Sequence, residues 1–236
     1  MSERREKILE VTGNMFSEQF EKSSTETVLH CEKESSRIIE GLLKALGEVI
    51  SQAFCKEEKN NAKVQYLLFS CLHSSIFLQK YLIRIDLMGE GLYNDNPLGT
   101  SYWDGEDIYC LFEKDISEFR RRMEGKVPRI RAYEMNYVRY AYAPYYHRMT
   151  KAFISEMLEE MLDGALACEA ETRTVQENTK EEGQIKIMFG EYMGEADILF
   201  DIRRERFYEV FQYLCRQPEY TAPACRLVFA GEAQHF

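Results

Sequence analysis

The fold class is decided by residues 81–87, YLIRIDL, where the hydrophobic period of the chain changes. Upstream, over 3–20 and 34–54, apolar side chains recur at the three- to four-residue spacing of one helical face. Within YLIRIDL they alternate with Arg84 and Asp86, a pattern typical of a half-buried strand. The chain therefore combines helices with at least one strand.

Residues on either side of this strand are expected to be helical or to form a loop. Apolar residues at helical spacing predict one helix over 62–74 and another over 106–123. A cluster of Gly, Asn, Asp and Pro over 89–99 predicts a loop. The strand near 80–88 therefore stands alone in this part of the chain.

The second half is expected to contain one long helical stretch followed by short strands. Residues 129–166 have helical periodicity, which Pro144 should kink or split because proline removes a backbone hydrogen bond. Alternating runs at 185–189 and 198–200 predict a β-hairpin. The elements expected beyond the hairpin are a helix over 201–215 and a strand over 226–229.

These elements predict an α+β protein with a predominantly helical N-terminal two-thirds and a small antiparallel sheet built largely from the C-terminal third. We expect a mainly helical region over 1–168 and a hairpin plus helix over 184–236, packed together as one domain. Residues 169–183 should form a polar linker or mobile loop, because Val175 is their one apolar side chain larger than alanine.

Composition favours a soluble cytoplasmic protein. The 236 residues carry 30 Lys and Arg against 40 Asp and Glu, a net charge of −10, and 45% are apolar. The seven cysteines have neither disulfide-framework nor zinc-ligand spacing, which indicates a reducing compartment. The N-terminus lacks the apolar segment of a signal peptide, and no apolar run reaches the ~20 residues of a membrane span.

Common catalytic and nucleotide-binding motifs are absent. A GxGxxG motif starting at Gly89 would need its third glycine at Asn94, and neither a P-loop nor an HExxH sequence occurs. We therefore expect a non-catalytic protein without a cofactor.

An acidic stretch over 86–107 contains six carboxylates and no basic residue. Paired carboxylates divide acid and base roles or ligate Mg²⁺, so one alternative is a metal-assisted hydrolase that uses this stretch. The other is a solvated loop in which Asp104 caps the following helix. We expect no bound metal, and the ligands of one, if present, would be Asp104, Glu106 and Asp107.

The segment 120–151 opposes the overall charge. Between Glu118 and Lys151 the chain has nine Lys or Arg and three Glu, with six tyrosines interleaved, of which Tyr133 and Tyr137 are expected on the core face. Arginine and tyrosine are enriched where proteins bind one another, and the same pair contacts phosphates and stacks on bases. The predicted contact residues are Arg120, Arg121, Arg122, Arg131, Arg139, Tyr140, Tyr142, Tyr146, His147 and Arg148.

Three interpretations of this segment stay open. Its cations pair internally with the acidic part of the chain, or they bind a protein partner, or they bind RNA or single-stranded DNA. We expect an interaction or regulatory protein that binds a macromolecule, most simply a protein, through a basic, tyrosine-rich helical face at about 120–151.

Residues 5–16 resemble the first helix of TetR-type regulators. The similarity ends within about twenty residues, because the recognition helix-turn-helix that should follow is replaced by Ser23-Ser24-Thr25-Glu26 and an acidic helix. No site residue is transferred from this resemblance.

Overall fold

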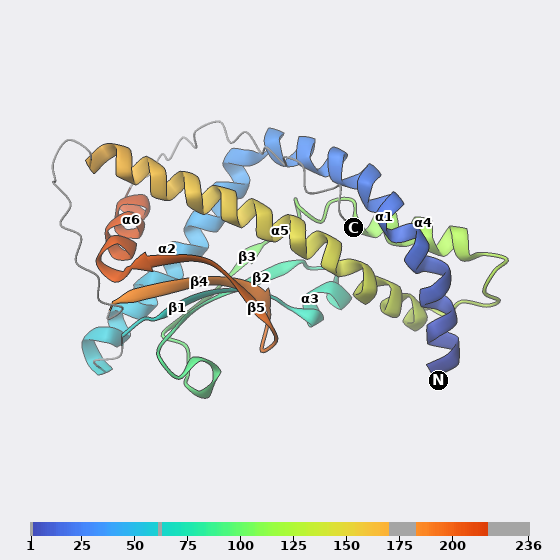
Figure 1. Ribbon diagram of the computed structural model, residues 1–236, viewed down its shortest axis with the longest axis horizontal. Helices are drawn as coiled ribbons and strands as arrows, with labels where there is room; N and C mark the ends of the chain where they lie inside the picture. The colour runs from blue at the N-terminus through green and yellow to red at the C-terminus, as the bar shows by residue number, and fades with distance from the viewer. Residues whose placement is uncertain (1, 61–62, 170–182, 217–236) are drawn as a thin grey trace.

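The computed structural model describes residues 2–60, 63–169 and 183–216, and two long helices open it (Figure 1). Helix α1 spans Ser2–Lys33, and α2 spans Ser35–Asn60. Both expected N-terminal helices are present, and α1 is longer than expected. The buried stripe of α2 comprises Ile38, Leu42, Leu46 and Val49, whose helical spacing turns one face toward the core.

Within the described residues, five strands form one mixed sheet in the order β3-β2-β1-β4-β5. Strands β1 and β4 are parallel, whereas the β1–β2, β2–β3 and β4–β5 pairs are antiparallel. The expected α+β class is confirmed. The expected purely antiparallel, mostly C-terminal sheet is wrong, since three strands come from the middle of the chain. The strands are β1 (Tyr66–Cys71), β2 (Leu82–Met88), β3 (Gly99–Asp104), β4 (Gln184–Glu191) and β5 (Ala196–Arg203).

Strand β1 replaces the helix expected over 62–74. It lies between β2 and β4, and five of its six residues are buried, so both of its faces are covered. A short apolar run buried on two sides has no polar alternation, and its spacing therefore also matched a helix. A helix is present only afterwards, as the six-residue α3 (His73–Leu78).

Strand β3 was not expected, although its sequence alternates. Ser101 and Trp103 are buried, whereas Tyr102 and Asp104 are exposed. It is an edge strand, and α2 covers its free edge. The side-chain amide of Gln52 donates to the carbonyl oxygen of Thr100 and accepts from its N–H, both at 3.0 Å. This pairing satisfies backbone groups that an edge strand leaves open.

The predicted hairpin and the helix after it are confirmed as β4, β5 and α6 (Arg204–Arg216). The β4–β5 hairpin joins the sheet through the parallel pairing of β4 with β1, in which Leu67 lies opposite Ile187. A short 3-10 helix, η1 (Leu92–Asn94), lies within the expected loop over 89–99. The strand expected over 226–229 and most of the 169–183 linker lie outside the described residues.

Helix α5 (Ala132–Glu169) passes through Pro144 without ending. Pro144 is exposed, so the carbonyl group that loses its helical partner is on the solvent side. The expected split at this proline is therefore absent. The helix expected over 106–123 begins later, as α4 (Phe112–Met123), after a series of turns.

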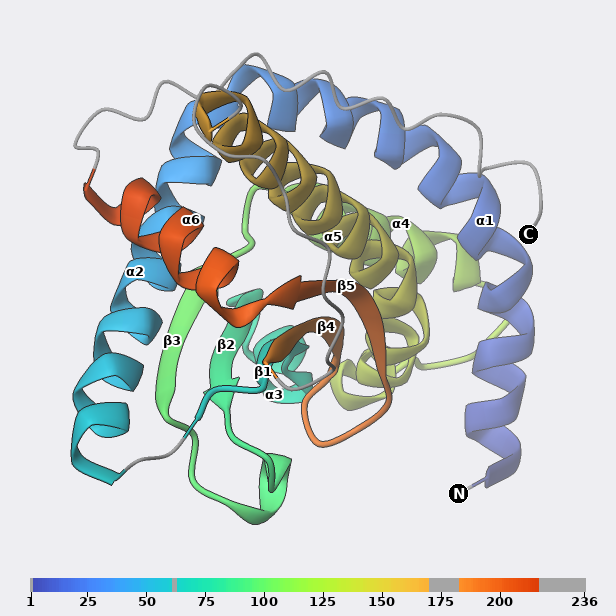
Figure 2. The same cartoon turned by 60° about the vertical axis from the view of Figure 1, so that its left-hand side comes forward.

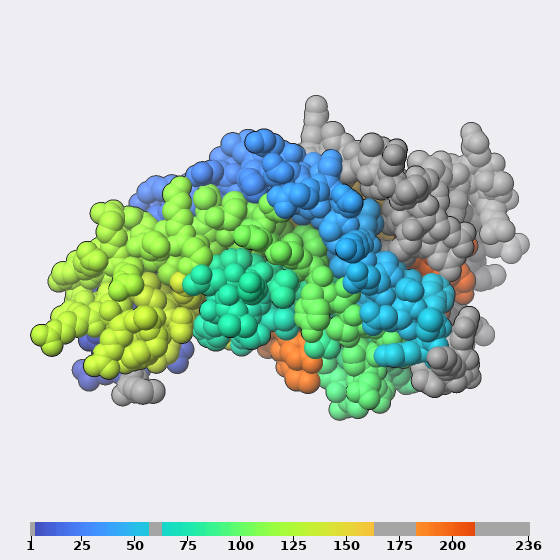
Figure 3. Space-filling view, turned by 180° about the vertical axis from the view of Figure 1, so that it is seen from behind, coloured from blue at the N-terminus to red at the C-terminus, as the bar shows by residue number. Residues whose placement is uncertain are grey.

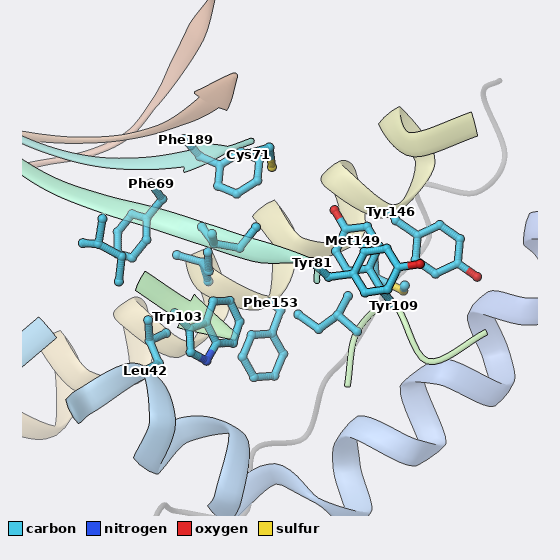
Figure 4. Packing of buried hydrophobic residues seen from close by; sticks show 14 of the residues in the cluster. Leu42, Phe69, Cys71, Tyr81, Trp103, Tyr109, Tyr146, Met149, Phe153 and Phe189 are labelled. Carbon is cyan, nitrogen blue, oxygen red and sulfur yellow. The ribbon is translucent and has the colours of Figure 1, made fainter. Parts of the chain in front are cut away.

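The helices α2, α5 and α6 cover one face of the sheet, and α1 lies across α5 (Figures 1 and 2). Trp103 of β3 stacks on Phe153 of α5 with ring centroids 5.9 Å apart (Figure 4). Tyr109 packs between Tyr81 and Tyr146 at the end of α5 nearer α3. The long helix therefore contacts the sheet with one half and the aromatic cluster with the other.

Candidate functional site

Helix α5 turns two of the predicted contact residues into the core. Tyr142 and Tyr146 are fully buried, and both hydroxyl groups donate to Oδ2 of Asp115 on α4 at 2.8 Å. From α1, Gln19 and Ser23 donate to Oδ1 of Asp115 at 2.8 and 2.6 Å. One buried carboxylate thus joins three helices. These tyrosines have no exposed surface for a partner, in contrast to the prediction.

Two more predicted residues have partners inside the protein. Arg139 pairs with Glu113 of α4, which also accepts a hydrogen bond from the Tyr81 hydroxyl group at 2.6 Å. The Tyr140 hydroxyl lies against the ring nitrogens of His73, and Nε2 of His73 is 3.0 Å from Oε2 of Glu191. The first contact fastens α5 to α4, and the second fastens it to the carboxyl ends of β1 and β4.

His147 is held in a largely apolar position. Its Nε2 atom is buried without a hydrogen-bond partner among the described residues. Burial lowers the pKa of His147 to about 4, an effect that the charge of Glu191 partly opposes and that His73 reinforces. At neutral pH this side chain is uncharged, so it adds no positive charge to a binding surface.

This burial predicts a pH-dependent stability. The unfolded chain protonates His147 below about pH 6.5, whereas the folded chain resists protonation until about pH 4. The unfolded state then binds more protons, and the free energy of unfolding should fall by about 2 kcal/mol between pH 7 and pH 5. Urea unfolding of wild type and His147→Met at both pH values tests this. The variant should lose that fall, the half-exposed control His30→Gln should keep it, and an unchanged fall in His147→Met would contradict the assignment.

The remaining arginines of the predicted face differ in their contacts: two form ion pairs, one lies over an aromatic ring, and two form no ion pair with a described carboxylate. Arg121 pairs with Glu118 at 2.6 Å, and Arg122 pairs with Glu18 of α1 at 3.2 Å. Arg148 lies over the ring of Tyr145, 4.7 Å from its centroid. Arg120 and Arg131 form no ion pair with a described carboxylate. Internal pairing therefore accounts for much of the basic segment.

The connection between α4 and α5 lies at one end of the molecule (Figures 1 and 3), and it carries an exposed basic surface. Over 120–133 the chain has six Lys or Arg and one Glu. Tyr133, expected in the core, is 52% exposed, and the guanidinium of Arg131 lies 6.0 Å from its ring centroid. We call this surface the α4–α5 corner, and its exposed members without an ion pair to described carboxylates are Arg120, Lys126, Arg129 and Arg131, together with Tyr133.

The corner is fixed from beneath. Arg4 pairs with the buried Glu134 and donates to the carbonyl oxygens of Pro128 and Arg129 at 3.0 and 3.2 Å. The guanidinium of Arg4 and the backbone N–H of Arg131 hold the pKa of Glu134 at about 2. The negative charge of Glu134 is thus neutralised by Arg4 of α1, while the cationic side chains of the corner remain exposed to solvent.

The acidic stretch over 86–107 separates into two places. Asp86 is buried and accepts from Arg84 at 2.7 Å and from the Thr100 hydroxyl at 2.6 Å. Asp104 accepts from the Glu106 N–H at 3.0 Å, which closes the turn after β3. The two places lie on different parts of the sheet, so the stretch does not form one acidic site.

Asp104, Glu106 and Asp107 line a cleft of about 710 Å³ between α1, α2 and β3. This volume falls within the ~300–1,000 Å³ of small-molecule sites. Oδ1 of Asp107 lies 2.9 Å from Nε2 of His30 and 2.6 Å from Nη2 of Arg37. The other polar and aromatic residues of the cleft are Lys44, Glu48, Tyr102, Trp103 and Cys110.

The cleft residues on α1 and α2 were not predicted from the sequence. Arg37, Gly41, Lys44 and Glu48 follow one another at helical spacing beside the apolar stripe of α2. Such a row is also what any solvated helix face presents. The missing information was the position of β3, which forms the opposite wall.

In the part of the chain that the structure describes, no group of three or more His, Cys, Asp or Glu is arranged to hold a metal ion. No described helix is long and apolar enough to cross a membrane. No protein-family model, curated protein or solved structure matches this chain. The geometry of the corner and the cleft is therefore the basis for a functional proposal.

Proposed function

We propose that this protein is a non-catalytic interaction protein that binds an acidic surface of a protein partner through the α4–α5 corner. The observation that carries the proposal is the exposure of four cations without ion pairs to described carboxylates beside the half-exposed Tyr133. Exposed arginine and tyrosine are the residue types that dominate protein-binding energies. The rest of the protein is acidic, so the corner gives an approaching partner one preferred orientation.

The rigidity of the corner supports the same proposal. Val127 is buried, and its N–H donates to the carbonyl oxygen of Met123 at 3.1 Å. Arg4 holds the carbonyl groups of Pro128 and Arg129 from the other side. A surface that is already ordered loses less conformational entropy on binding, which leaves more of the contact energy for affinity.

The alternative of RNA or single-stranded DNA binding is weakened by where the tyrosines lie. Stacking on bases needs exposed aromatic faces next to the cations. Tyr142 and Tyr146 are buried, Tyr140 contacts His73, and Tyr145 hydrogen-bonds to Ser17 and lies under Arg148. Tyr137 is partly buried beneath the guanidinium of Arg5, 5.3 Å from its ring centroid. Tyr133, 52% exposed, is therefore the most open of the six tyrosines of the segment.

Site-specific photo-cross-linking tests the proposal in cells that make the protein. A benzophenone amino acid replaces Tyr133, and the matched control replaces Tyr102, which is 49% exposed on β3. We expect a discrete protein adduct from position 133 that is absent from position 102. The double variant Arg120→Glu/Arg131→Glu should reduce that adduct at least ~10-fold because attraction becomes repulsion, whereas Lys33→Glu/Lys80→Glu should leave it unchanged.

Each other outcome would overturn the proposal. An adduct at position 133 that nuclease treatment removes would identify nucleic acid as the partner. Equal adducts at positions 133 and 102, or an adduct insensitive to the charge reversals, would show that the corner does not select a partner. The absence of any adduct at position 133 would remove the corner as a binding surface.

A further inference from the structure

The cleft between α1, α2 and β3 is a second candidate site, distinct from the α4–α5 corner. Its walls are the α2 side chains from Arg37 to Glu48, the end of β3 with its following turn, and His30 of α1. Figure 3 shows this side of the molecule, with α1 and α2 in blue bordering the green β3 and turn. Trp103 at its base is buried and stacked on Phe153, so this wall is already formed.

Some of the charges in the cleft have partners within the protein. Asp107 contacts both His30 and Arg37, and a carboxylate oxygen of Glu48 accepts from the Ser101 hydroxyl group at 2.8 Å. These contacts fix the side chains at the two ends of the α2 wall. The contact with Asp107 neutralises Arg37, whereas the Ser101 hydroxyl occupies one oxygen of Glu48 and leaves its charge without an ion pair to a described cation.

Besides Glu48, three further exposed charges in the cleft form no ion pair with a described residue. Lys44 forms no ion pair of 4.0 Å or less with a described carboxylate, and Asp104 and Glu106 form none with a described cation. The hydrogen bond that Asp104 accepts comes from the backbone of Glu106, which leaves its second oxygen available. Lys44 and three carboxylates, Glu48 among them, therefore share one cleft without forming ion pairs with one another.

We infer that the cleft binds a small zwitterion of the amino-acid or short-peptide class. The ligand ammonium group would contact the carboxylates of Asp104 and Glu106, and its carboxylate would contact Lys44. The half-exposed ring of Tyr102 offers an apolar surface to the rest of the ligand. A simple cation would be repelled by Lys44 and would leave it without a partner. A simple anion would be repelled by the carboxylates and would leave them without a partner.

The cleft is better suited to binding than to covalent chemistry. Burial raises the pKa of the Cys110 thiol, with the charge of Asp107 adding to that rise. A thiol in this state is a poor nucleophile, since the thiolate is the reactive form. The inference therefore concerns recognition of a small molecule and does not require turnover.

Isothermal titration with the twenty standard L-amino acids and with Gly-Gly, one at a time, tests the inference. We expect at least one of these probes to bind wild type. Its N-acetyl derivative, which lacks the ammonium, and its amide, which lacks the carboxylate, should each bind at least ~10-fold more weakly, because each loses one ion pair and is repelled by the cleft charge left without a partner.

Matched variants identify which wall of the cleft binds the ammonium and which binds the carboxylate of the ligand. In Lys44→Gln, amidation of the ligand should no longer weaken binding, whereas N-acetylation still should. In Asp104→Asn/Glu106→Gln the pattern should reverse. The controls Lys80→Gln and Glu40→Gln remove equivalent exposed charges outside the cleft and should keep the wild-type pattern.

Four results would overturn the inference. One is that no probe binds at millimolar concentration, and another is that binding persists equally in both cleft variants. A third is that a diamine binds as tightly as the best zwitterion, which would make the cleft a cation site. The fourth is that MnCl₂ alone raises the melting temperature of wild type but not of Asp104→Asn/Glu106→Gln, which would assign these carboxylates to a metal. Adduct formation at Tyr133 is a separate readout, so the two proposals fail independently.

Discussion

Asp115→Ala should lower the free energy of unfolding by about 4 kcal/mol, a large part of the ~5–15 kcal/mol that typical domains possess. The substitution removes the one acceptor shared by Gln19, Ser23, Tyr142 and Tyr146. Buried donors left without an acceptor cost about 1–3 kcal/mol each, and the four losses are not additive because the side chains rearrange together.

The two tyrosines cannot compensate by ionising or by turning to water. Burial and the charge of Asp115 raise the pKa of both Tyr142 and Tyr146, so their hydroxyl groups remain donors at any physiological pH. Both rings are also packed against Phe112 at centroid distances of 5.7 and 5.1 Å. Repositioning the hydroxyl groups would therefore disturb the aromatic cluster between α1, α4 and α5.

Urea unfolding of four variants checks this expectation even if Asp115→Ala does not fold. Tyr142→Phe and Tyr146→Phe each remove one donor and should cost about 1 kcal/mol. The exposed neighbour Lys114→Ala should stay within about 0.5 kcal/mol of wild type. A loss below about 1 kcal/mol in Asp115→Ala, together with neutral Tyr→Phe variants, would show that the carboxylate does not hold the three helices together.

The burial of Tyr142 and Tyr146 could have been predicted from the sequence, but the expected kink at Pro144 obscured the pattern. The core spacing that begins at Val138 continues through Tyr142 and Tyr146 to Met149 and Phe153 without changing phase. The expectation of a kink at Pro144 interrupted this stripe and moved two core residues into the predicted contact face. Proline lies on the exposed side of α5, so the helix keeps its register across it.

Tertiary pairing explains the other differences between expectation and structure. Strand β2 could be predicted because Arg84 and Asp86 alternate with apolar residues along it. Strand β1 is buried on both faces, so its sequence has no such polar alternation. The acidic residues around the cleft were singled out from the sequence, but the residues of α1 and α2 that face them lie more than fifty residues away in the chain. Long-range proximity of this kind is set by the sheet order and not by local spacing.

Gly99→Ala should destabilise the protein by about 3 kcal/mol, because it would push α2 away from β3. A Cβ atom at residue 99 would lie 2.1 Å from the carbonyl oxygen and 3.0 Å from the carbonyl carbon of Val49. Both contacts are with backbone, so no side-chain rotation relieves them. Gly99 pairs with Leu87 across the sheet, which prevents β3 from retreating without breaking that pairing.

Gly41→Ala is the matched control on the same interface. Its added Cβ would meet Trp103 at 3.7 Å, an ordinary van der Waals distance, and the site is within helix α2. Replacing a helical glycine by alanine in open space stabilises by up to ~1 kcal/mol. The two substitutions add the same methyl group to opposite walls of one interface, and we expect them to change stability in opposite directions.

Thermal and urea unfolding measure both variants, and titration with the amino-acid probes extends the test to the cleft. The close approach of α2 to β3 at Gly99 also positions Lys44 opposite the end of β3, so Gly99→Ala should weaken zwitterion binding even where the protein remains folded. Equal stability of Gly99→Ala and Gly41→Ala would mean that α2 does not rest on β3 at this distance. If Gly99→Ala is destabilised but binds the probe as tightly as wild type, the contact of α2 with Gly99 does not determine the geometry of the cleft.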